Sequence, residues 1–238
     1  MRLRCLLSLC LLLSAALPAH AGLIAYWNFN TLNIPTAAAP GSGSVPTSIA
    51  ATSGSGSLNL ATWGGLVDDF GGSTLNALNS DPAGASLSLI VGGTSAPFPG
   101  NNSFITFSTS LTGNENPILS FATRGTSTGF NSGIWSWSLN GSSFTAIPGV
   151  NTATTNTNFA TASVDLSSIN ALDNAATVFF RYTLSGGTGN SGNNRIDNFQ
   201  INASQITAVP EPTSMALVGA ALAGGLMRKF RRKKPAKA

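Results

Sequence analysis

The sequence predicts an all-β fold, an antiparallel sandwich of jelly-roll type. Between residues 22 and 208, strand-length runs rich in aromatic and β-branched residues recur at regular spacing, separated by clusters of Gly, Pro and Asn. No convincing amphipathic helix interrupts them. Charged residues make up 8% of the chain, against roughly a quarter in ordinary soluble proteins. Polarity comes instead from Ser, Thr, Asn and Gly, and this composition favours a sandwich.

About eight to ten strands are expected. They cover 23–30, 85–92, 103–111, 117–125, the hairpin 133–149, 159–168, 176–186 and 194–203. In the hairpin, Trp135, Trp137 and Leu139 alternate with serines, so we expect them to share one face toward the core. Asn140 and Gly141 are the favoured pair for a tight type I′ turn, in which both central residues need positive φ.

Two expectations concern the domain 22–208 as a whole. The segment 35–60 is low in complexity and weakly hydrophobic, so it is expected to form a long surface loop rather than a domain boundary. The opening strand is too short to fold alone. We expect it to pair with the last strand and to close the domain end to end.

The N-terminal segment predicts a secretory signal peptide over residues 1–21. It has a positive start, an apolar core over 6–17 and an A-x-A site for signal peptidase. Cleavage is expected between Ala21 and Gly22, with Ala19 as the other small residue of the site. The apolar core is too short for a retained membrane helix.

Both cysteines, Cys5 and Cys10, and the single histidine, His20, lie in this segment. Once it is removed, the mature chain has no thiol, no disulfide and no histidine. A disulfide framework and a cysteine-ligated metal are therefore excluded, and the commonest general base of enzymes is missing.

The basic residues are concentrated at the ends of the chain. The formal net charge is +4, yet the body 22–208 holds three arginines against seven acidic residues, a net charge of −4. Proteins that bind nucleic acids need basic side chains on the folded face. We therefore expect no nucleic-acid partner, and only calcium-bridged binding of anionic polymers.

The C-terminal segment combines three signals. Pro-Glu-Pro is followed by an apolar stretch over 213–227, about 22 Å long as a helix, against a hydrocarbon core of roughly 30 Å. This predicts a short transmembrane helix. The basic residues after it are expected to form a cytoplasmic tail over 228–237 by the positive-inside rule: Arg228, Lys229, Arg231, Arg232, Lys233 and Lys234.

The order of these signals over 209–234 resembles the PEP-CTERM sorting signal, with Val209, Pro210, Glu211 and Pro212 as the motif. The resemblance implies an exosortase as partner, a membrane transpeptidase-like cysteine enzyme of Gram-negative bacteria that produce exopolysaccharide. It also implies processing near Pro-Glu-Pro from an inner-membrane intermediate and delivery to the cell surface or extracellular matrix.

The body is similar to β-sandwich domains often found upstream of this signal. The matching pieces are "AYWNFN" (25–30), 124–145, "VDLSSI" (164–169) and 179–201, in the expected order. This resemblance implies no catalytic residues.

The sequence offers three candidate sites. Trp63, before two glycines, is the candidate for an exposed platform that stacks on sugars. Asn193, Asn194 and Asp197 are candidate ligands of structural Ca²⁺, which prefers oxygen ligands. The pair 68–69 is expected in a solvated turn, because neighbouring strand residues cannot face one substrate together.

The sequence thus predicts an exported, non-enzymatic protein of the cell surface or matrix, without a cofactor other than structural calcium. Two alternatives stay open: a carbohydrate-binding module for exopolysaccharide, and a hydrolase with an unrecognised site. An exposed aromatic row would favour the module. Two carboxylates about 5–10 Å apart in a cleft would favour a glycosidase.

Overall fold

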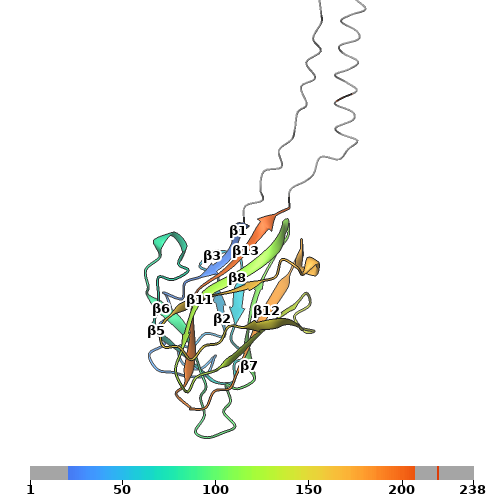
Figure 1. Ribbon diagram of the computed structural model, residues 1–238. Coiled ribbons are helices and arrows are strands. Elements are labelled where there is room, and N and C mark those ends of the chain that lie inside the picture. Colours follow the sequence, from blue (N-terminus) through green and yellow to red (C-terminus); the bar gives the residue numbers. More distant parts are fainter. Residues whose placement is uncertain (1–20, 207–218, 220–238) are drawn as a thin grey trace, which may run out of the picture. The chain divides into compact units, whose positions relative to one another are not determined.

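The computed structural model describes residues 21–206 and Gly219 (Figure 1). The described residues 21–206 belong to the first of two units of the chain, which ends at residue 206. In the described part of the chain, no helix is long and apolar enough to span a membrane.

Several expectations lie outside the described residues. These are the signal peptide up to residue 20, with Ala19, the motif 209–212, the basic cluster, and the apolar stretch 213–227 apart from Gly219. The transmembrane helix and the signal peptide therefore stay predictions.

Residues 21–206 form two antiparallel sheets, as the sequence predicts. Sheet A has seven strands and sheet B has six. The strands of sheet A are β1 (Ala21–Trp27), β3 (Ser53–Gly54), β5 (Leu66–Gly71), β6 (Ala85–Ile90), β8 (Asn114–Gly125), β11 (Ala160–Asp165) and β13 (Asn193–Gln205). The strands of sheet B are β2 (Ser48–Ala50), β4 (Ser57–Asn59), β7 (Ser103–Thr109), β9 (Ser132–Ser138), β10 (Thr145–Asn151) and β12 (Val178–Ser185).

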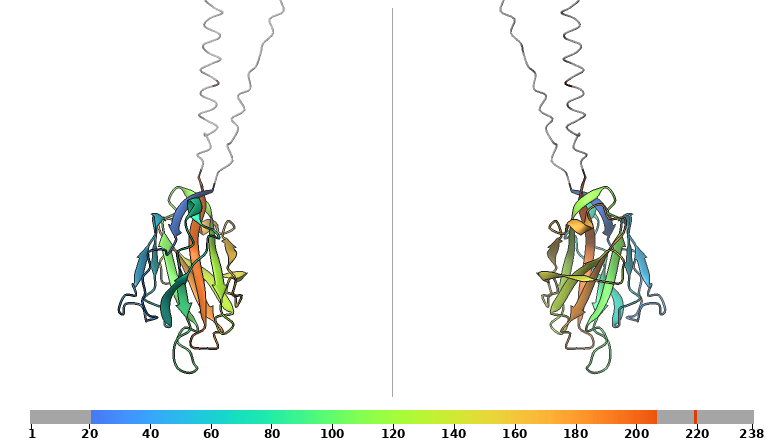
Figure 2. Two further views of the ribbon diagram at one scale, coloured as in Figure 1. Left: turned by 90° about the vertical axis from the view of Figure 1, so that its left-hand side faces the viewer. Right: turned by 90° about the vertical axis from the view of Figure 1, so that its right-hand side faces the viewer.

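Sheet B runs in the order β10-β9-β12-β7-β4-β2. Figure 2 shows β2 and β4, in light blue, at one edge of the sandwich, and β9 and β10, in yellow-green, at the opposite edge. Two 3₁₀ turns, Leu78–Ser80 and Asn170–Leu172, are the helical elements of residues 21–206. The strand-rich interpretation of the sequence is confirmed.

The first and last strands pair, as expected. β1 runs antiparallel to β13, with Ala21 opposite Ser204 and Trp27 opposite Phe199 (Figure 1). A register shift between Leu23 and Ala25 marks a bulge. Because the first and last strands pair, the two ends of the body lie side by side in sheet A.

The expectation of a loop over 35–60 is wrong in part, because this segment contributes β2, β3 and β4. Each strand is two or three residues long, too short to show a period of two. Glycine is required at position 54 of β3, because a Cβ there would clash with the carbonyl oxygen of Ile24 and the backbone φ is +75°. The expected turn at 68–69 is also wrong, because both residues lie within β5.

Aromatic side chains fill the space between the sheets. Phe107 of sheet B stacks on Phe199 of sheet A with ring centroids 3.8 Å apart, and Trp27 packs edge-on against both. Trp135 stacks on Tyr182 at 4.5 Å. All five rings are buried, so they form one core that joins the two sheets.

The predicted hairpin exists as β9 and β10, with Trp137 opposite Thr145. Trp135 is buried and Trp137 packs against the core, but Leu139 lies beyond the end of β9 and is 46% exposed. The expected two-residue turn is wrong. Six residues join the strands, and of the central pair only Gly141 has positive φ. Instead, the Asn140 side chain accepts hydrogen bonds from the backbone N–H of Ser142 and Ser143, which stabilises a wider loop.

Candidate functional site

The outer face of sheet B is built by strict alternation along two central strands. In β7 and β12 every second residue is buried in the core and the others face outward. Phe104, Thr106 and Ser108 thus lie on the outer face beside Phe179 and Arg181, and Thr106 is directly opposite Arg181 in the ladder. Strand β4 continues this face, because Asn59 pairs with Thr106 and Ser57 with Ser108.

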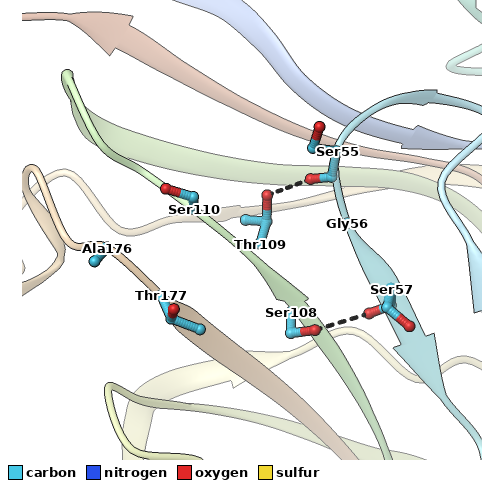
Figure 3. Close-up of a pocket in the computed structure, with 8 residues that line it drawn as sticks. All are labelled: Ser55, Gly56, Ser57, Ser108, Thr109, Ser110, Ala176 and Thr177. Carbon is cyan, nitrogen blue, oxygen red and sulfur yellow. Dashed lines mark hydrogen bonds between the residues drawn. The ribbon is translucent and has the colours of Figure 1, made fainter.

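Two adjoining hollows on this face make up what we call the outer groove. The first has a volume of about 270 Å³ and the second about 290 Å³, and Ser57 and Ser108 line both. The first is lined by Ser48, Ser57, Asn59, Thr62, Phe104, Thr106, Ser108, Gly141, Phe179 and Arg181. The second, shown in Figure 3, is lined by Ser55, Gly56, Ser57, Ser108, Thr109, Ser110, Ala176 and Thr177.

Six of the eight residues that line the second hollow carry a hydroxyl group, although most of its exposed surface is carbon. In Figure 3, the hydroxyl of Ser108 donates to the carbonyl oxygen of Ser57 at 3.4 Å, and that of Thr109 donates to the carbonyl oxygen of Ser55 at 2.5 Å. The Ser57 hydroxyl lies 2.8 Å from that of Ser48. Each hydroxyl retains acceptor capacity after one such bond. The surface therefore offers many neutral hydrogen-bonding groups and no carboxylate among its lining residues.

Arg181 lies between two aromatic rings. Its guanidinium carbon is 3.9 Å from the ring centroid of Phe104 and 3.5 Å from that of Phe144, in the β9–β10 loop. Its Nε is buried and makes no hydrogen bond within the described residues. Burial lowers the pKa of this guanidinium, and no described carboxylate offsets the shift. Because Phe104 and Phe144 contact the guanidinium as cation–π partners, the donors at its edge are left for a ligand.

The outer face of sheet A is covered by the segment 72–84. The amide of Asn198 donates to the carbonyl oxygens of Ser73 and Leu75, and it accepts a hydrogen bond of 2.6 Å from the Tyr26 hydroxyl. The Asn76 amide donates to the carbonyl oxygen of Asn198 at 2.7 Å. Asn198 is 1% exposed. This polar network holds the segment on the sheet, so the hydrogen-bonding groups of these residues are already paired within the protein.

Asp197 belongs to this covered network. Its carboxylate accepts hydrogen bonds from the backbone N–H of Ser73 and of Asn198, and the residue is fully buried. Burial raises the pKa of the Asp197 carboxyl to about 7, and the two backbone hydrogen bonds counter only part of that rise.

The predicted platform at Trp63 is wrong. Trp63 is 4% exposed, and its Nε1–H donates to the carbonyl oxygen of Leu66 at 3.0 Å. Its ring packs edge-on against Phe130 with centroids 5.5 Å apart. The neighbouring glycines let the chain turn Trp63 inward, because a Cβ on Gly65 would clash with the Ile90 carbonyl at 2.1 Å.

The expected calcium ligands have separate partners. The Asn194 amide bonds with the backbone of Phe130 and with the carbonyl oxygen of Thr154, whereas Asp197 bonds under the segment 72–84. The Asn193 amide donates to the carbonyl oxygen of Ser191. Within the described residues, no three His, Cys, Asp or Glu side chains are grouped to hold a metal ion. Structural calcium stays a prediction.

Arg181, Phe104 and strand β4, which lies between β7 and β2, were not predicted from the sequence. A signal was present: the alternating runs "SFITFSTS" and "VFFRYTLS" place polar and aromatic residues on one face and core residues on the other. The cation–π contact to Phe144 carried no signal, because it joins β12 to a loop more than thirty residues earlier in the sequence.

The C-terminal segment matches a known protein family model. Residues 208–233 match the PEP-CTERM protein-sorting motif. The chain carries a PEP-CTERM motif. This confirms the resemblance noted over 209–234, and it marks the protein for export and for sorting by an exosortase through a membrane-anchored signal of Gram-negative type.

Upstream of the PEP-CTERM motif, the sandwich is similar in fold to solved carbohydrate-binding modules. The tandem CBM22-1–CBM22-2 domain of Xyn10C from Paenibacillus barcinonensis aligns at 17% identity and a TM-score of 0.39, over 84% of this chain and 48% of that one. The C-terminal CBM6 of LamC from Zobellia galactanivorans aligns at 14% and 0.32, over 57% and 86%. The K3 adhesin domain of Lys-gingipain from Porphyromonas gingivalis aligns at 12% and 0.37, over 77% and 99%. Enzymes are also among the matching structures. No curated protein matches the chain significantly.

Proposed function

We propose that the protein is a non-enzymatic component of the cell surface or extracellular matrix, delivered there by an exosortase. The observation that carries the proposal is the PEP-CTERM motif over 208–233. The charge of the body is compatible with it, because residues 22–208 hold three arginines and no lysine and so carry no basic face for a nucleic-acid partner.

The residues of the body favour binding over catalysis. Asp68 and Asp69 are adjacent in β5, so their side chains point to opposite faces and do not act as a pair. The outer groove is lined by hydroxyls, an amide, two phenylalanines and one arginine. That lining supplies no general acid or base of the kind that hydrolysis requires.

A second candidate function is that of a carbohydrate-binding module for exopolysaccharide. The outer groove favours it, because sugars are bound by hydrogen bonds to hydroxyl and amide groups together with contacts to aromatic rings. Serine and threonine hydroxyls, the Asn59 amide and the rings of Phe104 and Phe179 lie together there.

The substitution Glu211→Ala in the producing cell tests the sorting proposal. It removes the single charge of the motif and leaves the apolar stretch 213–227 intact. We expect uncleaved precursor to accumulate in the inner membrane, measured by fractionation and immunoblotting. Glu115→Ala, at the other glutamate of the chain, is the matched control and should leave surface delivery unchanged. Surface delivery of Glu211→Ala at the wild-type level would contradict the proposal.

A further inference from the structure

Arg181 is the single charged residue in the strands of sheet B. The seven acidic residues of the body lie elsewhere. Five are in strands of sheet A, at positions 68, 69, 115, 165 and 197, and two, Asp81 and Asp173, directly follow the 3₁₀ turns. The net charge of the body is therefore a poor guide to this face, where a lone cation lies among neutral groups.

The surroundings of Arg181 favour an anion over a neutral ligand. Arg181 lines the first hollow, and its guanidinium contacts Phe104 and Phe144. Because Nε is buried, the two terminal amino groups are the donors that remain for a ligand. Their planar arrangement matches a carboxylate, which accepts two parallel hydrogen bonds from such a fork. No described carboxylate acts on Arg181, so this position is open to an external one.

The rest of the outer groove matches a sugar chain. The ladder places Ser48, Asn59, Thr106 and Arg181 in one row across β2, β4, β7 and β12. Hydroxyl and amide groups thus flank the guanidinium on one side. The second hollow extends this lining through Ser57 and Ser108, so the surface continues beyond the space of one sugar ring.

We propose that the outer groove binds an acidic polysaccharide, with the Arg181 guanidinium holding a uronate carboxylate and the hydroxyl row holding neighbouring sugars. This inference rests on the proposed surface role, because matrix polysaccharide is then within reach of the groove. It also replaces the sequence-based expectation that an anionic polymer needs bridging calcium. Arg181 itself supplies the positive charge.

The test is a calorimetric titration of the full-length protein, purified in non-ionic detergent, with hexagalacturonate. The same oligomer after carboxyl reduction is the comparison ligand, and it needs no protein variant. We expect binding of the acid form, weaker binding at high salt, and at least about tenfold lower affinity for the reduced form. Addition of a calcium chelator should leave the affinity unchanged.

Variants locate the site. Arg181→Gln and Arg181→Lys should each lower the affinity for hexagalacturonate by about tenfold to a hundredfold, because lysine keeps the charge but lacks the fork. Arg124→Gln is the matched control, since Arg124 also lies over a phenylalanine ring, at 5.7 Å from Phe159, but in sheet A. Thermal unfolding of each variant checks that the fold is kept, and Thr106→Val tests the same row without touching the charge.

Several outcomes would overturn the inference: equal affinity for the reduced oligomer, loss of binding with chelator, or unchanged affinity in folded Arg181→Gln. Equal binding of dextran sulfate would show recognition of charge alone and would overturn the carboxylate assignment. These failures are separate from failure of the proposed surface role, which the Glu211→Ala experiment tests by location. Normal surface delivery without binding would contradict only the inference.

Discussion

The outer faces of the two sheets carry similar polar residues and use them differently. On sheet A, Asn198 and Asp197 are buried beneath the segment 72–84, and their polar groups bond to its backbone. On sheet B, Thr106 and Ser108 are only half-buried and line a groove. The comparison shows that residue type alone does not separate structural polarity from a recognition surface. The presence of a covering segment does.

Charge follows the same division. Five of the seven acidic residues of the body lie in strands of sheet A, and the other two directly follow the 3₁₀ turns. The sheet B strands hold one arginine between two phenylalanine rings. A change of pH should therefore act on stability through the carboxyl groups of sheet A. Added anions should instead bind at Arg181 on sheet B.

Substitutions on the inner faces of the two sheets are expected to cause the largest losses of stability. Trp135 is fully buried, stacks on Tyr182 and lies 5.7 Å from Phe121 across the sandwich. Trp135→Ala should lower the free energy of unfolding by about 3–5 kcal/mol. Trp137→Ala, at a half-buried position of the same strand, should cost about 1–2 kcal/mol. Urea unfolding measures both, and equal losses would contradict the assignment of Trp135 to the core.

The next effect compares the two outer faces directly. Asn198 is buried, and Asn198→Ala removes two donors and one acceptor that bond to Ser73, Leu75 and Tyr26. It also places alanine at a φ of 50°. We expect a loss of about 2–4 kcal/mol. Thr106→Ala on the open face should change stability by less than about 0.5 kcal/mol. If the two losses in urea unfolding are alike, the distinction between covered and open faces is wrong.

The remaining comparison concerns pH. Burial raises the pKa of the Asp197 carboxyl from its ordinary value of 3.8 to about 7, so the folded state binds the proton more tightly than the unfolded state. The contribution of Asp197 to stability is fully present below about pH 4 and is lost as the pH rises to about 7. Asp197→Asn should remove this part of the decline in the urea midpoint.

Asp165→Asn is the control for the sign of the pH effect. Hydrogen bonds to Ser167 lower the pKa of Asp165, so its contribution is present above the unfolded pKa and is lost as the pH falls. Its removal should act at the acidic end of the profile. Parallel profiles for wild type and Asp197→Asn would show that Asp197 is not the titrating group.

The long strands could be predicted because their alternation is visible in the sequence. Residues 103–111 and 176–186 were expected as strands, and β7 and β12 fall within them. The short strands could not be predicted. β4 has a single buried side chain, Leu58, opposite Phe107, and one apolar residue in three shows no period.

The candidate site could be predicted from the sequence only in part. The interpretation of Trp135 as a core residue agrees with the structure, and Trp137 is half-buried against that core. Trp63 was taken for a surface residue because it precedes glycines. Its burial depends on Phe130 and on the Leu66 carbonyl. Only the partner of a side chain decides whether a tryptophan in a glycine-rich stretch faces inward.

The sequence by itself determined the all-β class and the PEP-CTERM motif, because period, composition and a contiguous motif are local properties of the chain. The pairing of the first and last strands was expected because the opening strand is too short to fold alone, but its register comes from the structure. The tertiary structure alone decided which polar residues are covered and which are open, and it brought Phe104, Phe144 and Arg181 together. These residues lie up to 77 positions apart. Their contact depends on strand order and register, which arise from the packing of both sheets on one core.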